Sequence, residues 1–157
     1  MTIQNLYVIQ SNGTLIYSKD YHSIKEDAII VSGFLSAIDS FAQTIGAGSQ
    51  IKQIETDKYK FVGNISNKYK IKFIMICDKK DSTSQVQSLL DSIRQSFVIK
   101  FNKLLKSKKP YKDLEKFDIW EQNLDRIINC SELSSFETVV STTLKDLKQI
   151  FKKIEED

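Results

Sequence analysis

Few side chains in this sequence could perform catalysis or bind a metal ion, and their settings favour neither. The only histidine, His22, lies in a polar connection without a nucleophile motif such as GxSxG, so a solvent-exposed side chain is its expected role. The two cysteines, Cys77 and Cys130, lie far apart without CxxC spacing, so we expect neither a zinc site nor a structural disulfide. We assign no catalytic residue, metal ligand or cofactor, and expect a protein that is not an enzyme.

Phosphate-binding and acid–base motifs are also missing from the sequence. No GxxxxGK[ST] or GxGxxG segment occurs, and Gly46 and Gly48 follow a helical pattern instead of opening a helix. The carboxylates of Glu155-Glu156-Asp157 and of the pair Asp113 and Glu115 fall in helical ends or solvent-facing runs, where solvation explains them. The chain is therefore not expected to be a GTPase itself.

The segment from Ala28 to Ser49 has the most informative composition. Its 22 residues contain one charge, Asp39, whereas 27 % of the whole chain is charged. The helical period predicts one apolar stripe that faces the core, widened by Ala28, Leu35 and Ala42. The stripe consists of Val31, Phe34, Ile38, Phe41 and Ile45. On this prediction Phe34 is a core residue, together with Phe73, Met75 and Phe97.

The opposite side of this predicted helix has small residues and no lysine, arginine or glutamate. Small residues let another backbone come close, and a helical glycine costs ~1 kcal/mol relative to alanine, so the pattern needs a cause. Three explanations are open: an association surface, cover by a later helix or the tail of the same chain, or a face that is small and hydrated. The association surface, extended by a short charged strand, would comprise Ile29, Gly33, Ser36, Ala37, Ser40, Ile51, Gln53 and Glu55.

A second unusual segment is basic. Six lysines fall within 13 residues that hold no acidic side chain: Lys100, Lys103, Lys106, Lys108, Lys109 and Lys112. A solvated helix face is the leading explanation, because the net charge is only +3 and few aromatic residues are interleaved. Contact with anionic lipid headgroups comes second. Nucleic acid comes third and is not expected as a partner.

The hydrophobic pattern predicts one domain over residues 1–157, with a core at 3–106 and a helical extension at 111–155. Strand-like runs at 6–9 and 15–17 flank Asn12-Gly13, which predicts a hairpin with positive φ at both turn residues. Three more strands are expected at 51–55, 59–65 and 69–77, with helices at about 27–45, 84–106 and within the extension.

Two of these strands, the first and the last, are apolar on both faces and should be central in the sheet, whereas 51–55 is short and charged as edge strands are. Helices must then cover both faces. The sequence predicts a three-layer α/β/α sandwich around a five-stranded, mainly antiparallel sheet in the order 2-1-5-4-3.

The resulting order, β-β-α-β-β-β-α-α-α, resembles the longin fold of longin-type SNAREs, clathrin-adaptor chains, the signal-recognition-particle receptor and GTPase-exchange complexes. The resemblance is carried by Asn5-Leu6-Tyr7-Val8-Ile9, Asn12-Gly13, the helix around Phe34 to Phe41, and Tyr59-Lys60-Phe61 with Phe73-Ile74-Met75-Ile76-Cys77-Asp78. The related roadblock fold begins with a helix before its first strand, and only five residues precede Leu6 here.

This resemblance implies a non-catalytic interaction module. Such a platform dimerises, with itself or with a related longin or roadblock protein, and binds or regulates a small GTPase, a separate chain, in membrane-trafficking machinery. The alternatives are a coat or adaptor subunit of a larger obligate complex and a small-molecule-binding sensor. No stretch approaches the ~20 apolar residues of a membrane span, so a cytoplasmic protein with peripheral membrane contact is expected.

Overall fold

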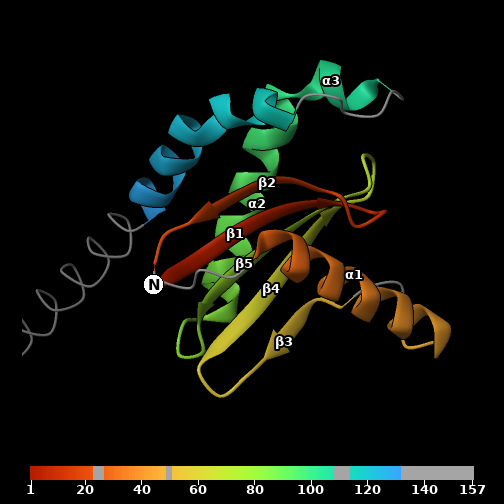
Figure 1. Cartoon of the computed structure of the whole chain (residues 1–157). Coiled ribbons are helices and arrows are strands. Elements are labelled where there is room, and N and C mark those ends of the chain that lie inside the picture. The colour runs from red at the N-terminus through yellow and green to blue at the C-terminus, as the bar shows by residue number, and fades with distance from the viewer. Residues whose placement is uncertain (23–26, 49–50, 108–113, 132–157) are drawn as a thin grey trace, which may run out of the picture.

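The computed structural model describes residues 1–22, 27–48, 51–107 and 114–131. Five antiparallel strands form one sheet in the order β2-β1-β5-β4-β3 (Figure 1). The strands are β1 (Ile3–Gln10), β2 (Leu15–Asp20), β3 (Gln53–Glu55), β4 (Tyr59–Ser66) and β5 (Ile71–Asp78). The strand order predicted from the sequence is thereby confirmed.

The central position of β1 and β5 follows from their composition. Almost every residue of both strands is buried, which is typical of strands covered on both faces. The edge strand β3 has only three residues, with Gln53 and Glu55 exposed and Ile54 half-buried. It is shorter than the predicted strand at 51–55 because Ile51 donates its backbone N–H to the Asp39 carboxylate (2.8 Å) instead of joining the ladder.

The β1–β2 hairpin closes with a different turn from the predicted one. Gly13 has a φ of 87°, but Asn12 is not among the described residues with positive φ. Gly13 donates its N–H to the Gln10 carbonyl, and Gln10 donates to the Thr14 carbonyl, both at 2.9 Å. These bonds enclose a three-residue loop that needs the left-handed conformation only at its glycine. The hairpin was predicted correctly; the positive φ at Asn12 was wrong.

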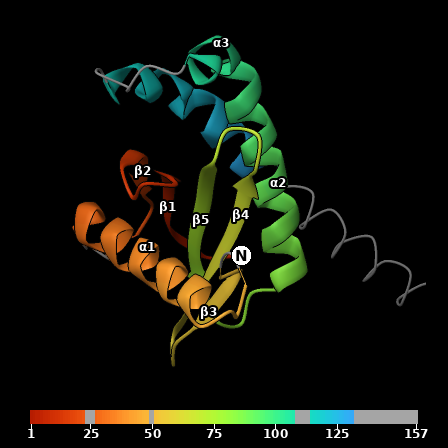
Figure 2. The same cartoon turned by 90° about the vertical axis from the view of Figure 1, so that its right-hand side faces the viewer.

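Helices cover both faces of the sheet (Figure 2). Of the described helices, α1 (Ala28–Thr44) is the one that lies on the first face, and α2 (Thr83–Lys100) lies on the other. Phe101, with φ −108° and ψ 17°, separates α2 from the short α3 (Asn102–Lys106), so the helix predicted at 84–106 is interrupted once. The 3₁₀ helix η1 (Leu114–Trp120) leads into a helix whose described part is 121–131. The rest of the predicted extension, with Glu155-Glu156-Asp157, lies outside the described residues.

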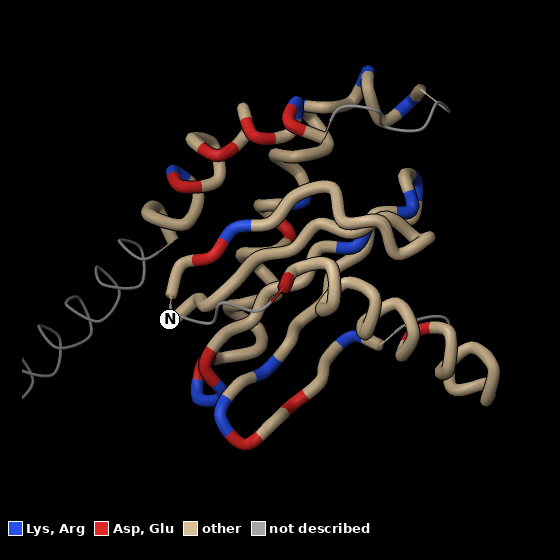
Figure 3. Tube along the Cα trace, viewed as in Figure 1, with Lys and Arg blue, Asp and Glu red and all other residues tan. Residues whose placement is uncertain are grey.

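α1 begins where its sequence signals indicate. Asp27 is the N-cap and its carboxylate accepts a hydrogen bond from the Ile29 N–H (3.0 Å). Asp39 is the one charged residue of the helix (Figure 3). The predicted core stripe is wrong for Phe34, Phe41 and Ile45, which are exposed, and right for Val31 and Ile38. The residues that face the sheet lie along a line through Leu35 and are Ala28, Val31, Ser32, Leu35, Ile38, Asp39 and Ala42.

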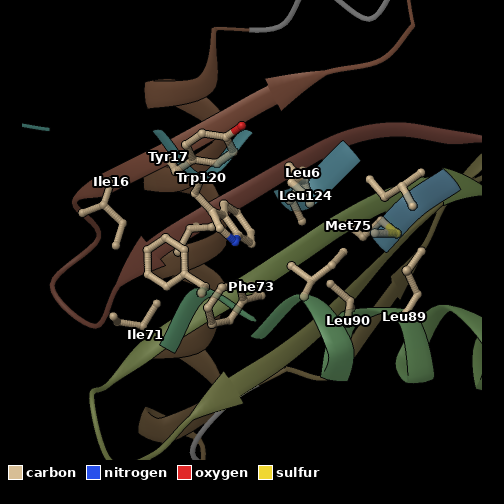
Figure 4. Close-up of a cluster of buried hydrophobic side chains, with 14 of the residues drawn as sticks. Leu6, Ile16, Tyr17, Ile71, Phe73, Met75, Leu89, Leu90, Trp120 and Leu124 are labelled. Atoms are coloured by element: carbon tan, nitrogen blue, oxygen red, sulfur yellow. The ribbon is translucent and has the colours of Figure 1, made fainter. Parts of the chain in front are cut away.

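The main hydrophobic core lies between the sheet and α2. Phe73 of β5 and Phe97 of α2 meet edge to face, with ring centroids 5.4 Å apart, and both are fully buried as predicted. Trp120 of η1 packs against Phe97 and against Tyr17 of β2, with centroids 4.9 and 5.3 Å away (Figure 4). Met75 is also buried here, as predicted. This core joins β1, β2, β4 and β5 to α2, η1 and the helix at 121–131.

The hydrophobic cluster under α1 is much smaller. Its fully buried members come from two strands and one position of the helix: Tyr7, Ile9, Ile74, Ile76 and Leu35. Partly buried residues of β3 and β4 surround them, including Ile54 and Phe61. The sheet is thus anchored firmly to α2 and only lightly to α1.

Candidate protein-interaction surface

The outer side of α1 exposes five large apolar residues: Ile29, Ile30, Phe34, Phe41 and Ile45. Each of these side chains is 57 to 72 % exposed. Since the helix has only Asp39 as a charge and that carboxylate points toward the sheet, no ionised group interrupts the outer side. Several large apolar side chains exposed on one helix of a small domain make a candidate interaction site. We call these five residues the α1 apolar face.

Small residues let α1 lie close to the β1–β2 hairpin. Ser32 is buried and Ser36 is half-buried. The Ser36 hydroxyl donates to the Ser32 carbonyl (2.9 Å), and a Cβ added to Gly13 would lie 3.1 Å from that hydroxyl oxygen. Part of the small-residue pattern therefore serves contact within the chain, and Phe34, Phe41 and Ile45 lie on the outer side.

The other predicted association residues of α1 lie at the surface. Ile29, Gly33, Ala37 and Ser40 are exposed, and a Cβ added to Gly33 would meet no atom within 4 Å. Nothing in the described part of the chain comes close to Gly33, so its small size serves no contact there. Ser36 is the one predicted α1 contact residue that is partly used inside the fold.

Among the described strands, β3 lies at an edge of the sheet and pairs only with β4. Lys52 accepts from the Gly63 N–H and Thr56 donates to the Tyr59 carbonyl, both at 2.8 Å. In an antiparallel ladder the intervening residues alternate, so Gln53 and Glu55 direct their N–H and C=O groups away from β4. The helix α1 and the edge strand β3 lie next to each other in the fold (Figures 1 and 2).

An ion pair that the sequence patterns did not reveal ties α1 to the sheet. Asp39 pairs with Lys72 of β5, and the two side chains are only 19 and 12 % exposed. The second carboxylate oxygen of Asp39 accepts the Ile51 N–H. Asp39 thus joins the helix, the central strand and the segment that enters β3.

A cavity of about 400 Å³ lies beside this tether, between α1 and the hairpin end of the sheet. Ile9, Leu35 and Ile74 form apolar walls, and Ser40, Gln43 and Lys70 lie at the polar side. The volume falls within the range of small-molecule sites, which keeps the sensor alternative open. Lys70 is a non-glycine residue with positive φ, 54°, at the rim.

Ionisable groups cluster on the opposite side of the sheet, where the described C-terminal helix meets β2. Lys19 bonds to Glu121 (2.7 Å) and Asp125 (2.6 Å). Burial lowers the pKa of Lys19, but hydrogen bonds to these carboxylates outweigh it, so the pKa is raised. Burial, followed by the charges of Glu121 and Asp125, raises the pKa of Tyr17. The cluster stabilises the contact of the helix with β2.

The cysteines, the histidine and the lysines considered in the sequence lie in the following settings. Cys77 is buried and Cys130 exposed, both as free thiols, and His22 is exposed. Within the described ranges there is no group of three or more metal-ligating side chains. Over the same ranges, no helix has the length and apolarity to cross a membrane. Lys100, Lys103 and Lys106 are exposed, whereas Lys108, Lys109, Lys112 and Asp113 lie outside the described residues.

Comparisons with known proteins show which family and which solved structures this chain is similar to. A model of the Sybindin-like family matches residues 3–131. The chain is similar to Myxococcus xanthus MglB, with a TM-score of 0.51 and 18 % identity over 68 % of this chain and 83 % of MglB. It is also similar to the mammalian SRP receptor, with a TM-score of 0.57 and 11 % identity over 85 % of this chain and 98 % of the other. The sequence matches no curated protein. At these identities the structural likeness concerns the fold.

Proposed function

The chain belongs to the Sybindin-like family, and on that premise we propose that it is a non-catalytic platform that pairs through α1 and β3 and binds or regulates a small GTPase. The α1 apolar face is the observation that carries the proposal. Five large apolar side chains on one uncharged helix surface are costly to leave in water, and a partner that covers them removes that cost. Phe34 and Phe41 supply aromatic anchors of the kind that dominate interface energies.

The free edge of β3 supports pairing in one register with a second copy or a related protein. Antiparallel pairing centred on Ile54 sets Gln53 opposite Glu55 of the partner subunit, twice, as hydrogen-bonded pairs. The Gln53 amide of each copy then lies opposite the Glu55 carboxylate of the other copy, on both sides of Ile54. Centring on Glu55 would set two carboxylates against each other, which destabilises a cross-strand pair. The two sheets would join at this edge while the two α1 helices meet above it.

The GTPase role follows from the longin resemblance and from the absence of a nucleotide loop in this sequence. A paired sheet flanked by two helices offers a broad surface, and the GTPase is a separate chain. The same proposal includes a cytoplasmic location and peripheral contact with a trafficking membrane.

The experiment is a pull-down from native lysate with the parent chain, Ala37→Arg and the control Gln95→Arg. Ala37 is exposed on α1, and Gln95 is exposed on α2, so both variants add one positive charge at a helix surface. We expect the parent and Gln95→Arg to retain a longin-type partner and a small GTPase, identified by mass spectrometry. Ala37→Arg should lose both. Equal GTPase recovery by all three proteins would contradict the need for pairing, and the lack of any GTPase would contradict the GTPase role.

A coat or adaptor subunit of a larger obligate complex is the second candidate, favoured by the extent of the α1 apolar face. An obligate subunit should be insoluble or aggregated when purified alone, because the face then has no cover. A soluble chain that forms a defined dimer favours the platform, whereas a chain that stays soluble only with several co-expressed partners favours the coat subunit.

A further inference from the structure

We propose that the end of the molecule formed by the β4–β5 turn, the last turn of α2 and α3 docks on an anionic phospholipid surface. Five lysines described by the structure gather there, all exposed: Lys68, Lys70, Lys100, Lys103 and Lys106. We call them the basic end. The inference is independent of the α1 apolar face and concerns a different part of the molecule.

Specific contacts bring the two lysine-bearing segments together. The Lys68 ammonium lies 5.3 Å from the centroid of the Tyr69 ring, and the Tyr69 hydroxyl bonds to the Asn102 side chain at 2.8 Å. Asn102 is the first residue of α3 and precedes Lys103. The turn and α3 are therefore held side by side although they are far apart in the sequence (Figures 1 and 2). A further bond, from the Ser11 N–H to the Lys70 carbonyl (2.9 Å), fixes the turn against the β1–β2 hairpin.

The segments that carry or directly adjoin these five lysines contain no acidic residue, whereas η1, whose Phe117 packs on Phe101, holds the exposed Glu115 and Asp118. Neither 3–19, nor 58–77, nor 92–107 includes an aspartate or glutamate. Among the described residues, none of the five lysines takes part in an ion pair. Five unpaired lysine charges outnumber the two carboxylates of η1, and an excess of positive charge attracts anions (Figure 3).

The other end of the strands provides an internal comparison. Lys58 and Lys79 lie in two turns that are joined there by the Lys79 N–H to Lys58 carbonyl bond (3.0 Å). Acidic residues lie beside them in the sequence: Asp57, Asp78 and Asp81. Two ends of one sheet thus have exposed lysines, but only at the basic end are the lysine-bearing segments themselves without acidic residues.

A helix dipole accounts for part of this pattern but not for all of it. Lysines near a helix C-terminus are stabilised by the carbonyl dipoles, and this applies to Lys100, Lys103 and Lys106. Lys68 and Lys70 lie in a turn between strands and gain nothing from a dipole. A shared external anion explains both groups of lysines at once.

An exposed aliphatic residue favours a membrane over nucleic acid as that anion. Ile99, 78 % exposed in the last turn of α2, adjoins Lys100 and is spaced four residues from Lys103. Apolar side chains beside lysines are typical of surfaces that lie at a lipid headgroup layer. Single-stranded nucleic acid needs accessible aromatic rings for stacking, and the Tyr69 ring is half-buried beneath Lys68.

The test is co-sedimentation of the full chain with vesicles of phosphatidylcholine alone or of phosphatidylcholine and phosphatidylserine in equal parts. We expect binding only to the anionic vesicles, weakening as salt is added. Lys103→Gln should lower the affinity about fivefold, and Lys68→Gln/Lys103→Gln roughly 25-fold, since each neutralised lysine removes a similar contribution. The matched control, Lys58→Gln/Lys79→Gln, carries the same net charge and should stay within about twofold of the parent.

Three results would overturn the proposal. The first is equal binding to neutral and anionic vesicles, and the second is an equal loss of affinity in Lys68→Gln/Lys103→Gln and in its control. Either result means that binding does not depend on the charge of this surface. The third is that the chain fails to bind anionic vesicles and instead binds single-stranded DNA through Lys68 and Lys103. In that case the basic end is a nucleic-acid site.

Discussion

The two faces of the sheet are covered in different ways. On the α2 side, aromatic residues from β2, β5, α2 and η1 interlock, and the helix at 121–131 adds Leu124 and Ile128 to the same core. On the α1 side, Leu35 is the one large side chain of the helix that is fully buried. The Asp39–Lys72 ion pair and the bond from the Ile51 N–H to Asp39 supply much of the remaining attachment.

The two sides of the sheet therefore differ in what they contribute. The α2 side stabilises the domain, while α1 is a light layer whose larger residues point outward. A helix that contributes little to the core can present Phe34 and Phe41 to a partner without loss of stability in the monomer. Each prediction below tests whether the two sides differ in this way.

The largest expected effect distinguishes two phenylalanines. Phe97→Ala should lower the free energy of unfolding by about 3–5 kcal/mol, because Phe97 is fully buried among Phe73, Phe101, Phe117 and Trp120. Phe34→Ala should change it by no more than about 0.5 kcal/mol, because that side chain is 57 % exposed. Urea unfolding of the monomeric proteins measures both. Equal losses would show that α1 is packed as tightly as α2.

A smaller effect is expected for the ion pair that ties α1 to β5. Lys72→Met and Asp39→Asn should each cost about 1–2 kcal/mol, since each leaves a mostly buried polar group without its partner. A double-mutant cycle by urea unfolding should give a coupling of about 1 kcal/mol. Additive losses would mean that the pair does not hold the helix. The exposed pair Arg94 and Asp91 on α2 serves as the control and should show little coupling.

The smallest effect concerns local opening of the two sides. Burial, followed by the charge of Asp81, raises the pKa of the Cys77 thiol to about 11, so this thiol stays protonated and protected on the α2 side at neutral pH. In a Cys130→Ser background, labelling of Cys77 should be slow. A thiol placed under α1 by Ile74→Cys, in Cys77→Ala/Cys130→Ser, should label about tenfold faster, because less buried surface opposes its exposure. Equal rates in native buffer would indicate that both sides open together.

Sequence patterns were sufficient for the sheet because its strands carry distinct signals. β1 and β5 are apolar on both faces and must be central, and β3 is short and polar. The α2 stripe was equally clear, since Arg94, Gln95 and Asp91 mark its solvent side. Where polar residues mark one side of a helix, periodicity predicts the buried side correctly.

The orientation of α1 could not be predicted in this way. Apolar residues occupy most of its circumference, and the one charge, Asp39, points inward to Lys72. Close approach of Ser36 to Gly13 selects which side meets the sheet, and that contact between distant segments leaves no periodic signal. For the same reason, the sequence did not predict that Lys68 and Lys70 join the lysines of α3, because only the fold brings their turn beside that helix.

Light scattering of the purified chain tests the central claim most directly, namely that the outer side of α1 is an association surface. Molar mass is measured over a range of concentrations for the parent, Ala37→Arg and the control Gln95→Arg, with melting curves for all three. We predict a concentration-dependent dimer for the parent and the control. We predict a folded monomer for Ala37→Arg, because the added charge would lie unpaired within the contact and cost several kcal/mol of association. If all three proteins show the same molar mass at every concentration, self-association through the outer side of α1 is wrong.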